Sequence, residues 1–128
     1  MDNKDITPQW LAGFFDGEGC ISSSIAIRKG GRSYINFYVC ITQKNTEILY
    51  AIASIYPDAQ TKINAKTPSL VFNGTKSKQF LLSIYPYSII KKEQIKLAIE
   101  FIDLITQNNS NINFFKRIEI HNKLRTLK

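Results

Sequence analysis

The stretch Trp10-Leu11-Ala12-Gly13-Phe14-Phe15-Asp16-Gly17-Glu18-Gly19 decides the fold. Thr7 is a good N-cap and Pro8 suits the first helical position, so a helix is predicted to begin there and to end at the glycines. Glu18 then lies at the helix C-terminus, where the macrodipole disfavours a bare carboxylate. A divalent cation held by Glu18 and a terminal carbonyl would remove this conflict.

Gly13 and Gly17 lie one turn apart on the same face of the predicted helix. Because glycine has no side chain, a second helix could approach this face backbone to backbone. The stretch therefore predicts a helix made for close pairing that ends in a metal-seeking acid. The alternative is an amphipathic core helix that happens to end in Gly-Glu-Gly.

The residues from Leu11 to Gly19 resemble the nine-residue signature of the LAGLIDADG homing endonucleases. The resemblance implies an α+β protein of the αββαββα fold, whose curved antiparallel sheet forms a saddle, here with extra C-terminal helices. It also implies a site-specific endonuclease that makes double-strand cuts in DNA.

Length and charge agree with such a protein. The 128 residues suit one domain, with the core fold in about residues 1–105 and a C-terminal loop and helix in 106–128. The formal net charge is +7, and the segment from Gly19 to Lys92 contains ten basic residues but only two acidic ones. This balance suits a polyanionic partner such as double-stranded DNA.

Cysteine and histidine usage narrows the chemistry. Cys20 and Cys40 form no CxxC pair, so neither a zinc site nor a disulfide framework is indicated. The single histidine, His121, argues against His-dependent nuclease motifs and leaves carboxylates for any chemistry. With no membrane-spanning run and no targeting signal, we expect no membrane partner, and a location in the cytoplasm or inside the organelle that encodes the chain.

Hydrophobic periodicity predicts the remaining elements. Period-two alternation indicates two ribbons, with strands at 20–28 and 33–43 and then at 59–66 and 69–73. In the fourth strand the run Leu70-Val71-Phe72 leaves open which face is buried. Helices are predicted from Asn45 or Thr46 to about Ile55, from Thr75 to Pro86, from about Lys91 to Thr106 and, after a polar loop, from Phe114.

Two further segments resemble the family. Ile41-Thr42-Gln43-Lys44 is similar to the end of the second strand, where a glutamine borders the metal site. The segment from Tyr85 to Gln94 is similar to the one that supplies an active-site lysine; alignment on its proline favours Lys91, with Lys92 as the runner-up. The chain departs from the pattern at Glu47, where some relatives carry an active-site arginine.

These matches imply roles for three side chains. Glu18 is the catalytic acid and, with the Gly17 carbonyl, the metal ligand; such hard oxygens favour Mg²⁺ over zinc, with Mn²⁺ able to substitute. Gln43 would position a water, and Lys91 would stabilise charge at the scissile phosphate.

One motif per chain supplies one carboxylate, whereas a catalytic metal cluster needs more than one carboxylate. Both strands of the DNA must also be cut. We therefore expect a homodimer that cuts a long pseudo-palindromic target. The expected dimer interface consists of Leu11, Gly13, Phe14 and Gly17.

DNA recognition is expected on the polar faces of the ribbons, because a two-stranded ribbon fits the major groove. The candidate DNA-binding residues are Ser22, Ser24, Ala26, Arg28, Lys29, Arg32, Tyr34, Asn36, Tyr38, Cys40, Lys62, Asn64 and Lys66. Function does not follow from fold alone, so two alternatives stay open: an RNA-binding intron maturase and a cleavage-inactive DNA-binding regulator.

Overall fold

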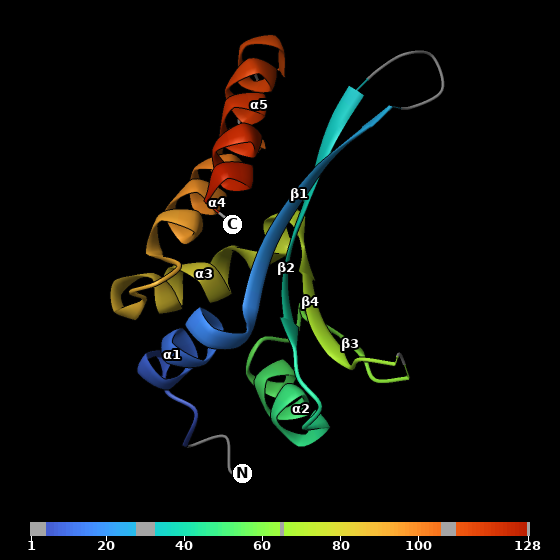
Figure 1. Ribbon diagram of the computed structural model, residues 1–128, viewed down its shortest axis with the longest axis vertical. Helices are drawn as coiled ribbons and strands as arrows, with labels where there is room; N and C mark the ends of the chain where they lie inside the picture. Colours follow the sequence, from blue (N-terminus) through green and yellow to red (C-terminus); the bar gives the residue numbers. More distant parts are fainter. Residues whose placement is uncertain (1–4, 28–32, 65, 106–109, 128) are drawn as a thin grey trace.

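A four-stranded antiparallel sheet in the order β1-β2-β4-β3 organises the computed structural model, which describes residues 5–27, 33–64, 66–105 and 110–127 (Figure 1). The elements follow one another as α1 (Pro8–Glu18), β1 (Gly19–Ile27), β2 (Ser33–Thr42), α2 (Thr46–Ile55), β3 (Gln60–Lys62), β4 (Ser69–Asn73), the 3-10 helix η2 (Gly74–Ser77), α3 (Lys78–Ile84), the 3-10 helix η3 (Tyr85–Tyr87), α4 (Lys92–Ile105) and α5 (Ser110–Thr126). This order confirms the predicted αββαββα arrangement with extra C-terminal helices, α4 and α5.

The first helix begins as predicted and leads into the sheet without a loop. The Thr7 hydroxyl accepts a hydrogen bond from the Trp10 N–H (3.1 Å), and Pro8 follows the cap. The chain turns at Gly19, where a Cβ atom would lie only 2.1 Å from the Phe15 ring. A side chain at position 19 would therefore force the helix and the first strand apart.

The β1–β2 ribbon is long and curved, and its outer part diverges from α5 (Figure 1). Ile21 pairs with Val39 and both are fully buried, in agreement with the alternation of the sequence. Ile25, on the same face, is 47 % exposed. The buried face thus follows the predicted period, but the helices cover Ile25 only in part, where it shares a hollow with His121 and Arg125 of α5.

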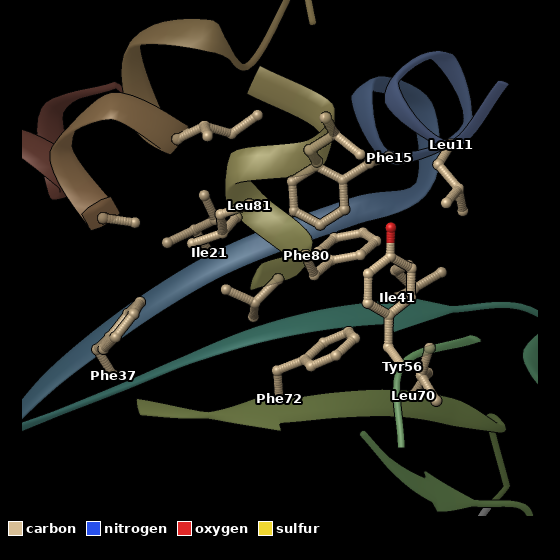
Figure 2. Close-up of a cluster of buried hydrophobic side chains, with 14 of the residues drawn as sticks. Leu11, Phe15, Ile21, Phe37, Ile41, Tyr56, Leu70, Phe72, Phe80 and Leu81 are labelled. Atoms are coloured by element: carbon tan, nitrogen blue, oxygen red, sulfur yellow. The ribbon is translucent and has the colours of Figure 1, made fainter. Parts of the chain in front are cut away.

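An aromatic cluster fills the space between the helices and the sheet (Figure 2). Phe80 of α3 stacks on Phe72 of β4 at 4.8 Å between ring centroids and meets Phe15 edge-on at 5.6 Å. Tyr56 contacts both Phe72 and Phe80 edge-on, and its hydroxyl is hydrogen-bonded to the Ser83 hydroxyl (2.8 Å). The motif helix is therefore packed into the core through Phe15.

The C-terminal helix is attached to the ribbon by a polar contact that the sequence did not reveal. The Nδ1 atom of His121, in α5, lies 2.6 Å from the Ser23 hydroxyl of β1. His121 is 4 % exposed and Ser23 is half-buried, so this contact is largely shielded from solvent. Within the described part of the chain, no helix is long and apolar enough to cross a membrane.

Three predicted boundaries differ from the structure. β3 comprises three residues instead of the predicted 59–66, because it pairs with β4 only from Gln60 to Lys62. Thr75 is not a helix cap, since it lies inside η2, whose turn is closed by a bond from the Ser77 hydroxyl to the Gly74 carbonyl.

The last helix begins at Ser110, four residues before the predicted start, because the asparagine-rich segment forms its first turn. Such polar residues are tolerated near a helix N-terminus. In β4, Leu70, Val71 and Phe72 are all buried, which explains why the sequence shows no alternation there.

We predict that Phe80→Ala lowers the free energy of unfolding by about 3–5 kcal/mol, because it opens a cavity in the aromatic cluster. Urea unfolding at fixed protein concentration would measure this loss. Leu82→Ala, in the same helix but 49 % exposed, is the matched control and should cost less than about 1 kcal/mol. Equal losses of unfolding free energy in the two variants would show that the aromatic cluster does not stabilise the core.

Candidate functional site

The motif helix α1 has one face in the core and one face exposed. Leu11, Ala12, Phe15 and Asp16 are buried, whereas Gly13 and Gly17 are exposed. A Cβ atom at either of these two glycines would meet nothing within 4 Å. The exposed face therefore has room for close approach by another helix.

The residues expected at the dimer interface divide between these two faces of α1. Gly13 and Gly17 lie on the exposed face, and Phe14 is half-buried and stacks on Trp10 at 4.9 Å. Leu11, however, is 1 % exposed and belongs to the chain's own core. The assignment of Leu11 to a dimer interface stays a prediction, and within this chain its side chain lies on the buried face of α1.

Asp16 connects α1 to the segment before α4. One carboxylate oxygen, Oδ1, accepts hydrogen bonds from the Ser88 hydroxyl (2.5 Å) and the Lys91 N–H (3.1 Å). The other, Oδ2, accepts from the N–H groups of Ile89 (2.8 Å) and Ile90 (3.1 Å). Asp16 thus satisfies backbone donors at the start of α4, which would otherwise lack partners. Sequence reasoning missed this role, although Asp16 stands within the motif.

The hydrogen bonds of Asp16 also set its ionisation. Burial by itself would raise the pKa of this carboxyl group, but the bonds from Ser88 and from the N–H groups of residues 89–91 favour the charged form. Their combined effect is larger, so the pKa of Asp16 lies below its ordinary value. Asp16 is therefore an anion at neutral pH.

Lys91 is placed at the C-terminal end of α1 by the same segment. Its Nζ atom donates a hydrogen bond to the backbone carbonyl of Asp16 at 2.6 Å. The neighbouring Lys92 points elsewhere: its Nζ atom is 3.4 Å from the Pro86 carbonyl and 5.0 Å from the centre of the Tyr85 ring. Of the two candidate lysines, Lys91 is the one that contacts the motif helix, two residues before the exposed Glu18.

Gln43 lies where β2 ends. Its N–H donates to the Pro68 carbonyl (3.1 Å), and its Oε1 atom accepts from the Asn45 N–H (3.2 Å). Gln43 also lines a hollow of about 220 Å³ between α1 and the start of α2, together with Trp10, Phe14, Asn45, Glu47 and Ile48. The structure therefore brings Gln43 to Phe14, one helical turn before Glu18, and places Glu47 in the same hollow.

One face of the sheet is polar across three of its strands. The register pairs Ser22 with Tyr38 and Ser24 with Asn36, and it continues from Tyr38 to Asn73 in β4. Ser69 and Asn73 of β4 also lie on this face, and sequence reasoning left both out. Their pairing with Thr42 and Tyr38 identifies them, a signal that exists only once the register is known.

The remaining DNA-binding candidates fall into three groups. Cys40 and Lys62 lie on the polar face, and Asn64 and Lys66 follow β3 and are exposed. The backbones of Ala26 and Tyr34 pair with each other at the far end of the ribbon. Arg28, Lys29 and Arg32 lie outside the described residues.

Few side chains at the site could act as metal ligands. Among residues 5–27, 33–64, 66–105 and 110–127, no group of three or more His, Cys, Asp or Glu side chains is arranged to hold a metal ion. Glu18 and the backbone carbonyls at the end of α1 are the hard oxygen donors at the motif.

A family model described as LAGLIDADG endonuclease matches residues 11–90. The chain belongs to this family. The match runs from the motif helix to the loop around Asp16, so it contains both the helix end and the sheet described above. LAGLIDADG homing endonucleases are DNA nucleases, and their members in the structural comparisons include DNA complexes.

Solved structures confirm the fold. The homing endonuclease I-CvuI, in complex with the I-CreI target in Mg²⁺ with the DNA not cleaved, superimposes with a TM-score of 0.83 at 25 % identity, over 94 % of this chain and 81 % of that one. The archaeal intron-encoded I-Vdi141I, complexed with DNA, gives 0.82 at 22 % identity over 98 % and 86 %. I-TnaI gives 0.76 at 20 % over 99 % and 97 %. No curated protein sequence matches the chain significantly.

We predict that Asp16→Asn lowers the free energy of unfolding at neutral pH by about 1–3 kcal/mol, because an amide cannot accept all the bonds made to the carboxylate. The native pKa is lowered, so the contribution of Asp16 is complete above the unfolded-state pKa of about 4 and is lost as the pH falls through the native pKa.

Urea unfolding at a series of pH values would measure this difference, which should shrink toward acid pH. Asp58→Asn, at an exposed turn position, is the control and should change stability little at any pH. A loss for Asp16→Asn that stays constant down to acid pH would contradict the proposed charge effect.

Proposed function

We propose that the chain is a site-specific homing endonuclease that cuts both strands of a long, pseudo-palindromic DNA target as a homodimer, using Mg²⁺, for which Mn²⁺ can substitute. The observation that carries this proposal is the contact between the Lys91 Nζ atom and the Asp16 carbonyl. This contact holds the positively charged Lys91 ammonium at the end of the motif helix, where the exposed Glu18 carboxylate also lies.

The homodimer follows from the exposed face of α1. Gly13 and Gly17 leave this face open to a second copy of the same helix. A two-fold axis there would bring the two Glu18 residues together at the helix ends. Two carboxylates side by side repel each other, so a bound cation would favour both the pairing and the ionised state.

The donors at the end of α1 fit a hard divalent ion. A carboxylate and backbone carbonyls are oxygen ligands, which Mg²⁺ and Mn²⁺ prefer, and Glu18 and Gly17 would provide them. When bound there, the ion supplies Lewis acidity at the phosphodiester and lowers the pKa of water. The I-CvuI structure solved in Mg²⁺ supports this choice by analogy.

The side chains of the chain itself would position the phosphate and the attacking water. The Lys91 ammonium uses one of its three donors on the Asp16 carbonyl, which leaves two for the scissile phosphate and for the charge that develops on it. The Gln43 amide can hold a water in the hollow beside α1, since it carries both a donor and an acceptor.

Target recognition would take place on the polar face of the sheet. Side chains such as Asn36 and Lys62 suit base edges in the major groove, with about 1–3 kcal/mol of discrimination for each good bidentate contact. The fold of the two DNA-bound relatives supports this use of the sheet.

We propose that the reaction takes place in the cytoplasm, or inside the organelle that encodes the chain.

The deciding experiment is cleavage of a randomised DNA library by the purified chain, with and without Mg²⁺. We expect metal-dependent cuts at one near-palindromic sequence. Glu18→Gln should abolish cutting, a loss of at least about a hundredfold, while the affinity for the selected DNA persists, because the substitution removes a ligand but no DNA contact. Sequence-specific binding without any cleavage would favour a DNA-binding regulator, and preference for structured intron RNA would favour a maturase.

A second prediction separates Lys91 from its neighbour. Lys91→Ala should lower the cleavage rate by about 10²-fold or more, as expected for loss of one electrostatic stabiliser, with nearly unchanged DNA affinity. Lys92→Ala is the matched control, because it removes the same charge one residue away, and it should retain most of the activity. Equal loss of affinity and cleavage in Lys91→Ala would assign Lys91 to docking instead.

A further inference from the structure

The two cysteines of the chain lie directly opposite each other on the β1–β2 ribbon. Cys20 of β1 pairs with Cys40 of β2 in the antiparallel register, and both thiols are free. Opposed residues of an antiparallel pair have Cα atoms about 4.5–5.5 Å apart. A disulfide spans Cα separations of about 4.4–6.8 Å. The backbone therefore already holds these two cysteines within range of a covalent bond.

The sulfur atoms currently contact other side chains. The Sγ atom of Cys20 is 3.3 Å from the Ser22 hydroxyl, and that of Cys40 is 3.8 Å from the Thr42 hydroxyl. Each partner lies two residues further along its own strand, and the strands run in opposite directions, so the two sulfurs point toward opposite ends of the ribbon. Rotation about the Cα–Cβ bonds, between staggered rotamers, would turn them toward each other.

Small oxidants can reach this pair. Cys20 is exposed and Cys40 is partly exposed. Both belong to the polar face of the sheet, on which Ser22 and Tyr38 are their neighbours. Any change in the two sulfurs is therefore a change in the surface that would lie against DNA.

We propose that Cys20 and Cys40 form a site of reversible oxidation, at which a disulfide across the ribbon weakens DNA binding. The inference rests on the proposed function, because that function assigns the polar face to the target. The bridge takes both sulfurs away from Ser22 and Thr42 and removes two thiol groups from the contact surface.

A peroxide is the oxidant in this scheme. One cysteine thiolate attacks a peroxide oxygen and breaks the O–O bond, which forms a sulfenic acid and releases hydroxide. The other thiolate attacks the sulfenic sulfur, which forms the S–S bond and releases a second hydroxide. The two protons lost by the thiols convert these hydroxides to water, so two thiols and one hydrogen peroxide give one disulfide and two waters. A dithiol reductant returns the two electrons by thiol–disulfide exchange and is itself oxidised to a disulfide.

DNA and the disulfide should compete, because each is favoured by a different arrangement of the same surface. Coupling between two such events is reciprocal. If the bridge weakens DNA binding, then bound DNA must disfavour the bridge. Bound target DNA should therefore lower the fraction of the chain that is oxidised at equilibrium.

The test uses the full chain, reduced and then treated with hydrogen peroxide. Alkylation with N-ethylmaleimide followed by intact mass spectrometry should show a monomer that has lost two hydrogens and carries no label, and dithiothreitol should restore two labelled sites. Affinity for the DNA selected from the library should fall about tenfold on oxidation, the size of one lost base contact, and recover on reduction.

Cys20→Ser is the control, because it leaves a single thiol that cannot form the bridge. Whatever its own affinity, peroxide treatment before any reduction should leave that affinity unchanged. Disulfides only between chains, or an oxidised chain with unchanged affinity, would overturn the inference. The mass measurement involves no DNA, so an intramolecular bridge in a chain that binds no DNA would refute the proposed function and not the bridge.

Discussion

The hydrogen bonds of the Asp16 carboxylate are the interaction on which the site depends. They join the last turn of α1 to the segment that precedes α4, although the two are more than seventy residues apart in sequence. Lys91 follows in the same segment, and its side chain returns to the Asp16 carbonyl. A buried anion without these donors would be costly, so the loop must wrap around it. The position of the ammonium is thus a consequence of satisfying a buried charge.

The direct passage from α1 into β1 is the second constraint. Because Gly19 already pairs with Ile41, the last residue of the helix lies one step from the sheet. Gln43 is only two residues beyond Ile41, so the register also brings it beside the motif helix. A slip of one residue would turn every side chain of the ribbon to the opposite face, exchanging Ile21 and Val39 for Ser22 and Tyr38. The same pairing therefore orders the core, the polar face and Gln43.

Much of this arrangement was predictable from local signals. The Thr7-Pro8 start, the alternation in β2 and the Asn45 cap are short-range features, and the structure confirms each of them. Contacts between distant segments were not predictable in the same way. Nothing in the sequence indicates that Asp16 meets Ser88, that His121 meets Ser23 or that Cys20 faces Cys40, because these depend on packing and register. The burial of Leu11 was likewise not predicted, since the motif's residues divide between two faces that the pattern alone does not separate.

The charges near the end of α1 favour Lys91 over Lys92 as the active-site lysine. Glu47 lies in the first turn of α2, where the helix dipole favours an acid, and it lines the same hollow as Gln43. In the proposed site, an acid there would add negative charge beside the phosphodiester. Lys92 is directed to Pro86 and Tyr85 and not to α1. Of the two candidate lysines, Lys91 is therefore the one that the proposed mechanism assigns to the phosphate at the end of α1.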